Sequence, residues 1–150
     1  MSADTGADAG ADLSHVRRMW DQDRASAALG IELLDVDVED TDGQPLGHAS
    51  TRMTIAATMV NGHDIAHGGF LFTLADSTFA LACNAAGRLT VAASCDITFL
   101  LPCNLGDVIV ATARERVTYG RSGITDVTLC RTTDNAVVAE FRGRSRALRP

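Results

Sequence analysis

One stretch of the sequence decides the fold: Asn61-Gly-His-Asp-Ile-Ala-His67-Gly-Gly-Phe-Leu-Phe-Thr-Leu-Ala-Asp76-Ser-Thr-Phe-Ala-Leu-Ala-Cys-Asn-Ala-Ala-Gly87. Residues 70–86 are apolar almost all round, which is typical of a buried helix, and Gly87 is placed to end that helix in a left-handed conformation. A single carboxylate, Asp76, interrupts the apolar run, although Asp is seldom buried without a partner. The stretch therefore predicts a central helix whose one acid has a chemical role.

The segments on either side of this helix alternate apolar and polar residues, which is the pattern of half-buried strands. We expect strands at residues 31–39, 46–58, 90–100, 108–119, 124–133 and 136–146. Residues 13–28 predict a short amphipathic helix, which Ser14 can cap. Antiparallel strands around one buried helix indicate an α+β fold, with the helix laid along one face of a curved sheet.

The composition is that of one ordinary globular domain, with 46% hydrophobic and 21% charged residues in 150. We expect this domain at residues 13–150, after a flexible leader at residues 1–12 that lacks the features of a signal peptide. Four cysteines without a Cys-x-x-Cys pair indicate free thiols and a cytoplasmic location. The absence of a long apolar run and the net charge of −6 argue against membrane and nucleic-acid partners.

The chemistry is expected at Asp76 and at the glycine pair Gly68 and Gly69. A carboxylate taken out of water has an altered basicity, and backbone N–H groups at a helix N-terminus stabilise a polarised carbonyl. If the helix begins at Gly68, Asp76 lies about 12 Å further along its axis, at about 1.5 Å per residue. Either only one of these groups is catalytic, or a two-fold partner supplies its own Asp76. We predict the second arrangement, an obligate homodimer with shared active sites.

The polar neighbours His67 and Asn61 each allow two interpretations. Each side chain either contacts the substrate carbonyl or only shapes the loop, since His67 can orient it and Asn61 suits a turn. His63 and His67 superficially resemble the His-Glu-x-x-His zinc motif. The flanking glycines disfavour a helix there and no third ligand is evident, so we predict no metal site.

Arginine side chains in the C-terminal part are candidates for binding an anionic ligand. Arg142 and Arg144 alternate along the last strand and therefore share one face. Arg121, Ser122 and Gly123 belong to a glycine-bounded turn whose backbone N–H groups can bind a phosphate. The alternative for both sets is a solvated surface without a ligand.

The motif Asn61-Gly-His-x-x-x-His67-Gly-Gly-x-Leu-Phe-x-Leu-Ala-Asp76 resembles that of the hot-dog-fold acyl-CoA thioesterases, most closely their phenylacetate-degradation (PaaI-type) branch. The resemblance implies a long central helix wrapped by a curved antiparallel sheet, dimers with sites at the interface, and commonly tetramers. It makes Asp76 the catalytic carboxylate, supplied by the opposite subunit, and Gly68 the backbone donor to the thioester carbonyl. It places Asn61 and His67 near that carbonyl.

The implied reaction is hydrolysis of an aryl- or (hydroxy)phenylacetyl-CoA thioester, with Asp76 as nucleophile or general base and with no cofactor beyond the CoA of the substrate. The rival functions are a hot-dog enoyl-CoA hydratase or dehydratase and a non-catalytic acyl-CoA-binding module. The acyl group, the faces that form a tetramer and the role of Gln22 stay open. Three aromatic residues are candidates for the acyl pocket or the core, with the core favoured for two: Phe70, Phe72 and Phe79.

Overall fold

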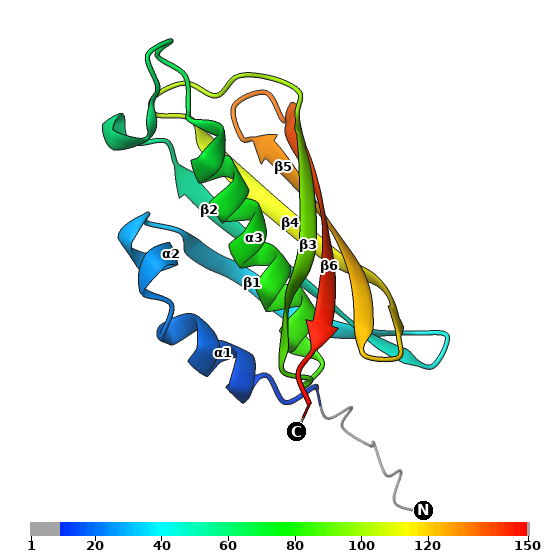
Figure 1. Ribbon diagram of the computed structural model, residues 1–150. Coiled ribbons are helices and arrows are strands. Elements are labelled where there is room, and N and C mark those ends of the chain that lie inside the picture. The colour runs from blue at the N-terminus through cyan, green and yellow to red at the C-terminus, as the bar shows by residue number, and fades with distance from the viewer. Residues whose placement is uncertain (1–9, 150) are drawn as a thin grey trace, which may run out of the picture.

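The computed structural model describes residues 10–149 and has one long helix held against a single antiparallel sheet (Figure 1). This arrangement is the predicted α+β fold. The elements in chain order are α1 (Ser14–Asp21), α2 (Arg24–Ala28), β1 (Glu32–Thr41), β2 (Gln44–Thr54), the 3-10 turn η1 (Ala57–Met59), α3 (Gly68–Ala85), β3 (Thr90–Phe99), β4 (Val108–Tyr119), β5 (Ser122–Arg131) and β6 (Val137–Ala147).

The sheet has six strands in the order β1-β2-β4-β5-β6-β3, and every neighbouring pair is antiparallel. Strand β3, which directly follows α3 in the chain, pairs with the last strand, so it lies at one edge of the sheet while β1 lies at the other (Figure 1). The β1–β2 hairpin turns through Asp42 and Gly43, both at positive φ, as in a type I′ turn. Asp-Gly is a common sequence for such a two-residue hairpin turn.

The core lies between α3 and the face of the sheet that carries the alternate, buried residues of β2, β4, β5 and β6. Two strand glycines let this helix come close. A Cβ on Gly47 would collide with the backbone carbonyl of Ala82, and a Cβ on Gly143 would lie 2.5 Å from the ring of Phe79. The close contact explains how an 18-residue apolar helix is accommodated by one layer of sheet.

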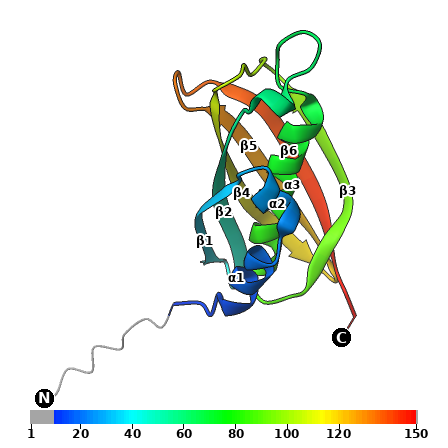
Figure 2. The same ribbon diagram turned by 90° about the vertical axis from the view of Figure 1, so that its left-hand side faces the viewer.

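The N-terminal segment differs from the single helix predicted at residues 13–28. It forms two short helices, α1 and α2, because Asp23 takes an extended conformation and its carboxylate caps α2. Ser14 does not cap α1; instead its own N–H donates to Asp12 Oδ1 at 3.0 Å. Figure 2 shows both helices lying beside α3.

The second strand also ends earlier than residues 46–58 predicted. Strand β2 stops at Thr54, and the chain then forms the turn η1 before it reaches the loop that leads into α3. Gly87 has a φ of +101° and follows the helix, as expected for a left-handed cap. The central helix and its stop signal are thus placed as the sequence indicated.

Residues 1–9 of the expected leader lie outside the described residues. All four cysteines are free, and Cys83 and Cys103 are buried. Within residues 10–149, no helix has the length and hydropathy needed to cross a membrane.

Candidate active site

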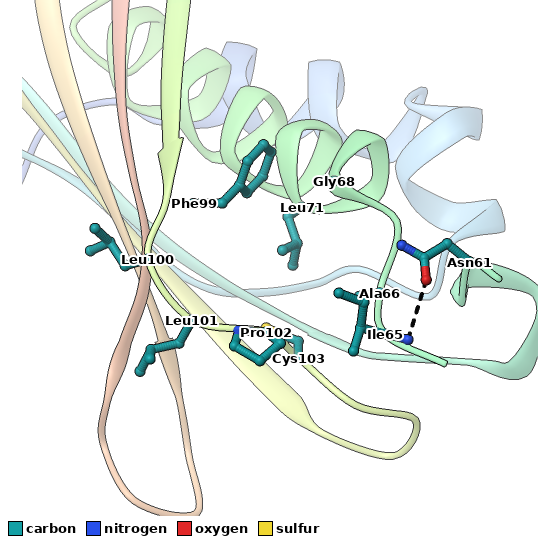
Figure 3. A pocket seen from close by; sticks show the side chains of 10 residues that line it. All are labelled: Asn61, Ile65, Ala66, Gly68, Leu71, Phe99, Leu100, Leu101, Pro102 and Cys103. Carbon is teal, nitrogen blue, oxygen red and sulfur yellow. Dashed lines mark hydrogen bonds between the residues drawn. The ribbon is translucent and has the colours of Figure 1, made fainter. Parts of the chain in front are cut away.

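A pocket of about 430 Å³ opens at the N-terminus of α3, between the loop that precedes this helix and the segment that leaves β3 (Figure 3). Most of its surface is apolar. The lining residues are Asn61, Ile65, Ala66, Gly68, Leu71, Phe99, Leu100, Leu101, Pro102 and Cys103. The pocket thus combines two of the predicted site residues, Asn61 and Gly68, with side chains that the sequence did not single out.

Asn61 is held in one orientation by the turn that it forms. Its Oδ1 accepts hydrogen bonds from the backbone N–H group of His63 at 2.8 Å and from that of Ile65 at 3.4 Å, the second of which is drawn in Figure 3. Because the oxygen is used in this way, Nδ2 is the group left for a ligand, and no acceptor for it occurs within residues 10–149. Asn61 therefore shapes the turn and also offers a donor to the pocket.

The helix begins at Gly68, as the distance argument assumed, and His67 is its capping residue. The Nδ1 atom of His67 accepts a hydrogen bond from the Gly69 N–H at 3.4 Å. Gly68 is the first helical residue, so its own N–H has no acceptor within the helix. The ring of Phe99 lies so close that a Cβ on Gly68 would be 2.8 Å from Phe99 Cζ. Glycine is needed here to keep the N–H accessible beside the ring.

Asp76 does not line this pocket, although it lies on the same helix. It is partly buried. Burial raises the pKa of the Asp76 carboxyl above its usual value, and the negative charge of Asp23 adds to the effect. The chain thus has a carboxylate of increased basicity and a separate pocket with helix N-terminal donors, and the two are not combined within one copy.

The residues predicted to bind CoA lie elsewhere. Arg142 donates to the carboxylate of Asp126 at 2.7 and 2.9 Å, and Arg144 lies 3.9 Å from Asp96. These side chains border a separate groove of about 560 Å³ that also takes in Arg116. Within one chain, the groove and the pocket at Gly68 share no lining residue.

The predicted anion-binding turn joins β4 to β5 and is far from the pocket. Ser122 pairs with Arg146, and the carbonyl of Arg121 accepts from the Ala147 N–H, so this turn lies beside the end of β6. In Figure 1 it is at the opposite end of the molecule from the N-terminus of α3. Arg121, Ser122 and Gly123 therefore do not meet Gly68 of the same chain.

The remaining candidates divide between core and surface. Phe79 is buried, and Phe72 packs edge-on against Phe141 with ring centroids 5.3 Å apart, so these two rings belong to the core. Gln22 is exposed at the end of α1. Among residues 10–149, no group of three or more metal-ligating side chains comes together, and His63 is exposed.

Comparison with known proteins identifies the family to which the chain is similar. A model of the thioesterase superfamily matches residues 63–138. The acyl-coenzyme A thioesterase PaaI of Escherichia coli K12 is 39% identical over 130 residues, which cover 87% of this chain and 86% of that protein. The structure of the E. coli PaaI protein from the phenylacetic acid degradation operon matches with a TM-score of 0.81 at 37% identity, covering 92% of this chain and 97% of that one.

A mutant of the phenylacetic acid degradation protein PaaI from Thermus thermophilus also matches, with a TM-score of 0.71 at 32% identity over 82% of this chain and 97% of that one. The family model covers about half of the chain, and the E. coli relative covers most of it. The chain therefore belongs to the thioesterase superfamily, as a hot-dog-fold thioester hydrolase of the PaaI type.

Proposed function

We propose that this thioesterase hydrolyses an aryl- or arylacetyl-CoA thioester to the free acid and CoA, without a cofactor. The observation that carries the proposal is the apolar pocket at the N-terminus of α3, which has the Gly68 N–H and Asn61 Nδ2 at its border. An aryl ring is apolar and a thioester carbonyl accepts hydrogen bonds, so both parts of such a substrate match the pocket. The PaaI relatives, one named for phenylacetic acid degradation, support an arylacetyl group.

The proposed reaction needs one carboxylate and one hydrogen-bond donor to the carbonyl oxygen. An Asp76 oxygen attacks the carbonyl carbon, the C–S bond breaks, CoA leaves as the thiolate, and water then hydrolyses the mixed anhydride. Alternatively, Asp76 takes a proton from the water that attacks the carbonyl. A thiol with a pKa near 8.5 leaves without a general acid. In both routes the Gly68 N–H stabilises the negative charge that develops on the carbonyl oxygen.

We further propose that the active unit is a homodimer in which Asp76 serves the pocket of the partner. Two observations support this arrangement. Asp76 is absent from the pocket of its own chain, and the outer edge of β3 has no neighbouring strand within residues 10–149. Antiparallel pairing of two β3 edges would join the sheets and bring the two α3 helices side by side. The CoA-binding roles of Gly69, Arg121, Ser122, Gly123, Arg142 and Arg144, assembly into a tetramer and a cytoplasmic location stay predictions.

The first experiment replaces Asp76 by Asn and follows thiol release from phenylacetyl-CoA with a disulfide dye. We expect a folded dimer whose kcat is lower by about 10²-fold or more, since a catalytic carboxylate contributes on that scale. Activity within a few-fold of wild type would refute the role of Asp76. Benzoyl-, medium-chain and short-chain acyl-CoA esters, assayed in parallel with wild-type protein, identify the acyl group.

The second experiment mixes the variants Asp76→Asn and Gly68→Ala after joint unfolding and refolding. Each homodimer should have reduced activity, because every site has either no Asp76 carboxylate or a Cβ at position 68 that crowds the approach to the backbone N–H beside the Phe99 ring. A mixed dimer has one site with both groups intact, so an equal mixture should regain about a quarter of the wild-type sites. If each chain forms its own site, mixing restores nothing.

The rival functions give different products. A hydratase or dehydratase would convert 3-hydroxyacyl-CoA to the enoyl-CoA, which absorbs in the ultraviolet. A binding module would hold acyl-CoA without releasing thiol. The same assay conditions therefore separate all three functions.

A further inference from the structure

A chain of short hydrogen bonds links helix α2 to the turn of α3 that carries Asp76. The carboxylate of Asp23 accepts from the Ser26 N–H at 2.9 Å and from the Ser26 hydroxyl at 2.6 Å. The Ser26 hydroxyl oxygen lies 2.8 Å from the hydroxyl oxygen of Ser77. Ser26 is only 1% exposed, so the middle of the link is shielded from water. Ser77 is the residue directly after Asp76.

The direction of these hydrogen bonds follows from their chemistry. An ionised carboxylate only accepts hydrogen bonds, so the Ser26 hydroxyl donates its hydrogen bond to Asp23. The Ser26 oxygen must then accept the hydrogen bond donated by the Ser77 hydroxyl. Hydrogen bonds to a charged acceptor are stronger than those between neutral groups. The negative charge of Asp23 is thus connected through two hydroxyls to the residue beside Asp76.

Among the described residues, no cation is close enough to Asp76 to lower the pKa of its carboxyl. The charged group near it is Asp23 from α2, and the titratable groups that sense its charge are the thiols of Cys83 on α3 and Cys95 on β3. Burial raises the pKa of both thiols, so they are neutral at pH 7. Asp23 is therefore the group that can set the charge environment of Asp76 from outside its own helix.

We propose that Asp23 is a positioning residue for thioester hydrolysis: through Ser26 and Ser77 it holds α2 against the turn that carries Asp76 and keeps a second negative charge beside that carboxylate. The inference rests on the proposed function of Asp76. A more basic carboxylate is a better nucleophile and a better base at neutral pH. The cap of α2 and the basicity of Asp76 would then depend on the same side chain.

The test is Asp23→Asn, which removes the charge but keeps the size and an oxygen that accepts from the Ser26 N–H. Asn is also a good helix cap, so we expect the variant to fold. The acid limb of the pH profile of kcat/KM should move to lower pH, because the charge of Asp23 raises the pKa of Asp76 in addition to burial. Carbon-13 NMR titration of the Asp76 carboxyl in the free protein should show the same shift. Asp12→Asn is the matched control, because the Asp12 carboxylate also accepts from a backbone N–H at the start of an N-terminal helix, and it should leave both readouts unchanged.

Ser77→Ala tests the mechanical part of the link while both carboxylates remain. We expect kcat to fall several-fold with KM unchanged, because Asp76 would lose its fixed position. An Asp76 titration in Asp23→Asn that matches wild type would refute the effect of the charge, and a wild-type kcat in Ser77→Ala would refute the clamp. The NMR readout needs no enzymatic activity, so a failure of this inference is distinguishable from a failure of the proposed reaction.

Discussion

Replacing Glu115 by Gln should stabilise the fold at neutral and alkaline pH but not in acid. Glu115 lies on β4 and is only 7% exposed. Its nearest donor is the Gly47 N–H, at a long 3.4 Å. Burial raises the pKa of this carboxyl from 4.5 to about 7, which outweighs the lowering effects of that hydrogen bond and of Arg88. The folded protein therefore holds a proton that the unfolded chain releases.

The sign and size of the effect follow from these two pKa values. As the pH rises above 4.5, the unfolded chain loses the proton first, so the free energy of unfolding falls until the folded carboxyl also ionises near pH 7. The pKa difference of about 2.5 between the folded and the unfolded chain corresponds to about 3 kcal/mol in the free energy of unfolding, at 1.36 kcal/mol per pKa unit. Gln cannot ionise and keeps an oxygen for the Gly47 N–H. The variant should match wild type within about 1 kcal/mol near pH 5 and exceed it by about 3 kcal/mol near pH 8.5.

Urea unfolding measures this difference, followed by the fluorescence of Trp20, the one tryptophan of the chain. Both proteins are compared at equal concentration, because the proposed dimerisation would couple stability to concentration. Glu39→Gln, at an exposed position of β1, makes the same change in net charge and is the control. A gain in stability that is equal at the two pH values would refute the buried-carboxyl reasoning.

Three further outcomes are expected. Gly143→Ala should lower the free energy of unfolding by about 1–3 kcal/mol, because its Cβ would lie 2.5 Å from the Phe79 ring in the core; unchanged urea unfolding would contradict this contact. Gly68→Ala should keep the free energy of unfolding within about 1 kcal/mol, since the half-exposed Phe99 ring can turn away from the added Cβ. It should still lower kcat/KM for thioester hydrolysis by about tenfold or more, because the Cβ and the displaced ring crowd the substrate carbonyl at the Gly68 N–H. Dilution below the dissociation constant of the dimer should reduce the specific activity, followed by thiol release alongside light scattering; activity per chain that is constant through dissociation would exclude shared sites.

The sequence predicted the central helix well because its signals are local. Gly68 and Gly87 bound an apolar run, and both mark helix ends in the structure. The break at Asp23 was not predicted, because residues 13–28 keep helical spacing throughout. An Asp within such a stretch is only a weak sign that one helix ends and a second, capped by that Asp, begins. Aspartate is a known N-cap, so the residue itself was the available signal.

The pocket was predicted less completely, because its walls are far apart in the chain. Phe99 and Pro102 reach the N-terminus of α3 only because β3 pairs with the last strand and returns along the helix. No local pattern reveals that pairing. The burial of the Glu115 carboxyl was not predicted for the same reason, since the alternation of its strand shows which face this residue occupies but not how closely Gly47 approaches it.

The position of Asp76 is best explained by the edge of the sheet. Thr73, Asp76 and Ala80 recur at intervals of three and four on α3 and stay partly exposed, which marks one face of the helix that the sheet of its own chain does not cover. Strand β3 runs beside this helix at the sheet edge, and its residues 91–94 are exposed as well. A second copy related by a two-fold axis, as in the proposed dimer, would cover both the exposed helix face and the outer edge of β3. Such a copy would remove Asp76 from water further and so raise its pKa more, which makes dimerisation itself a means of activating the carboxylate.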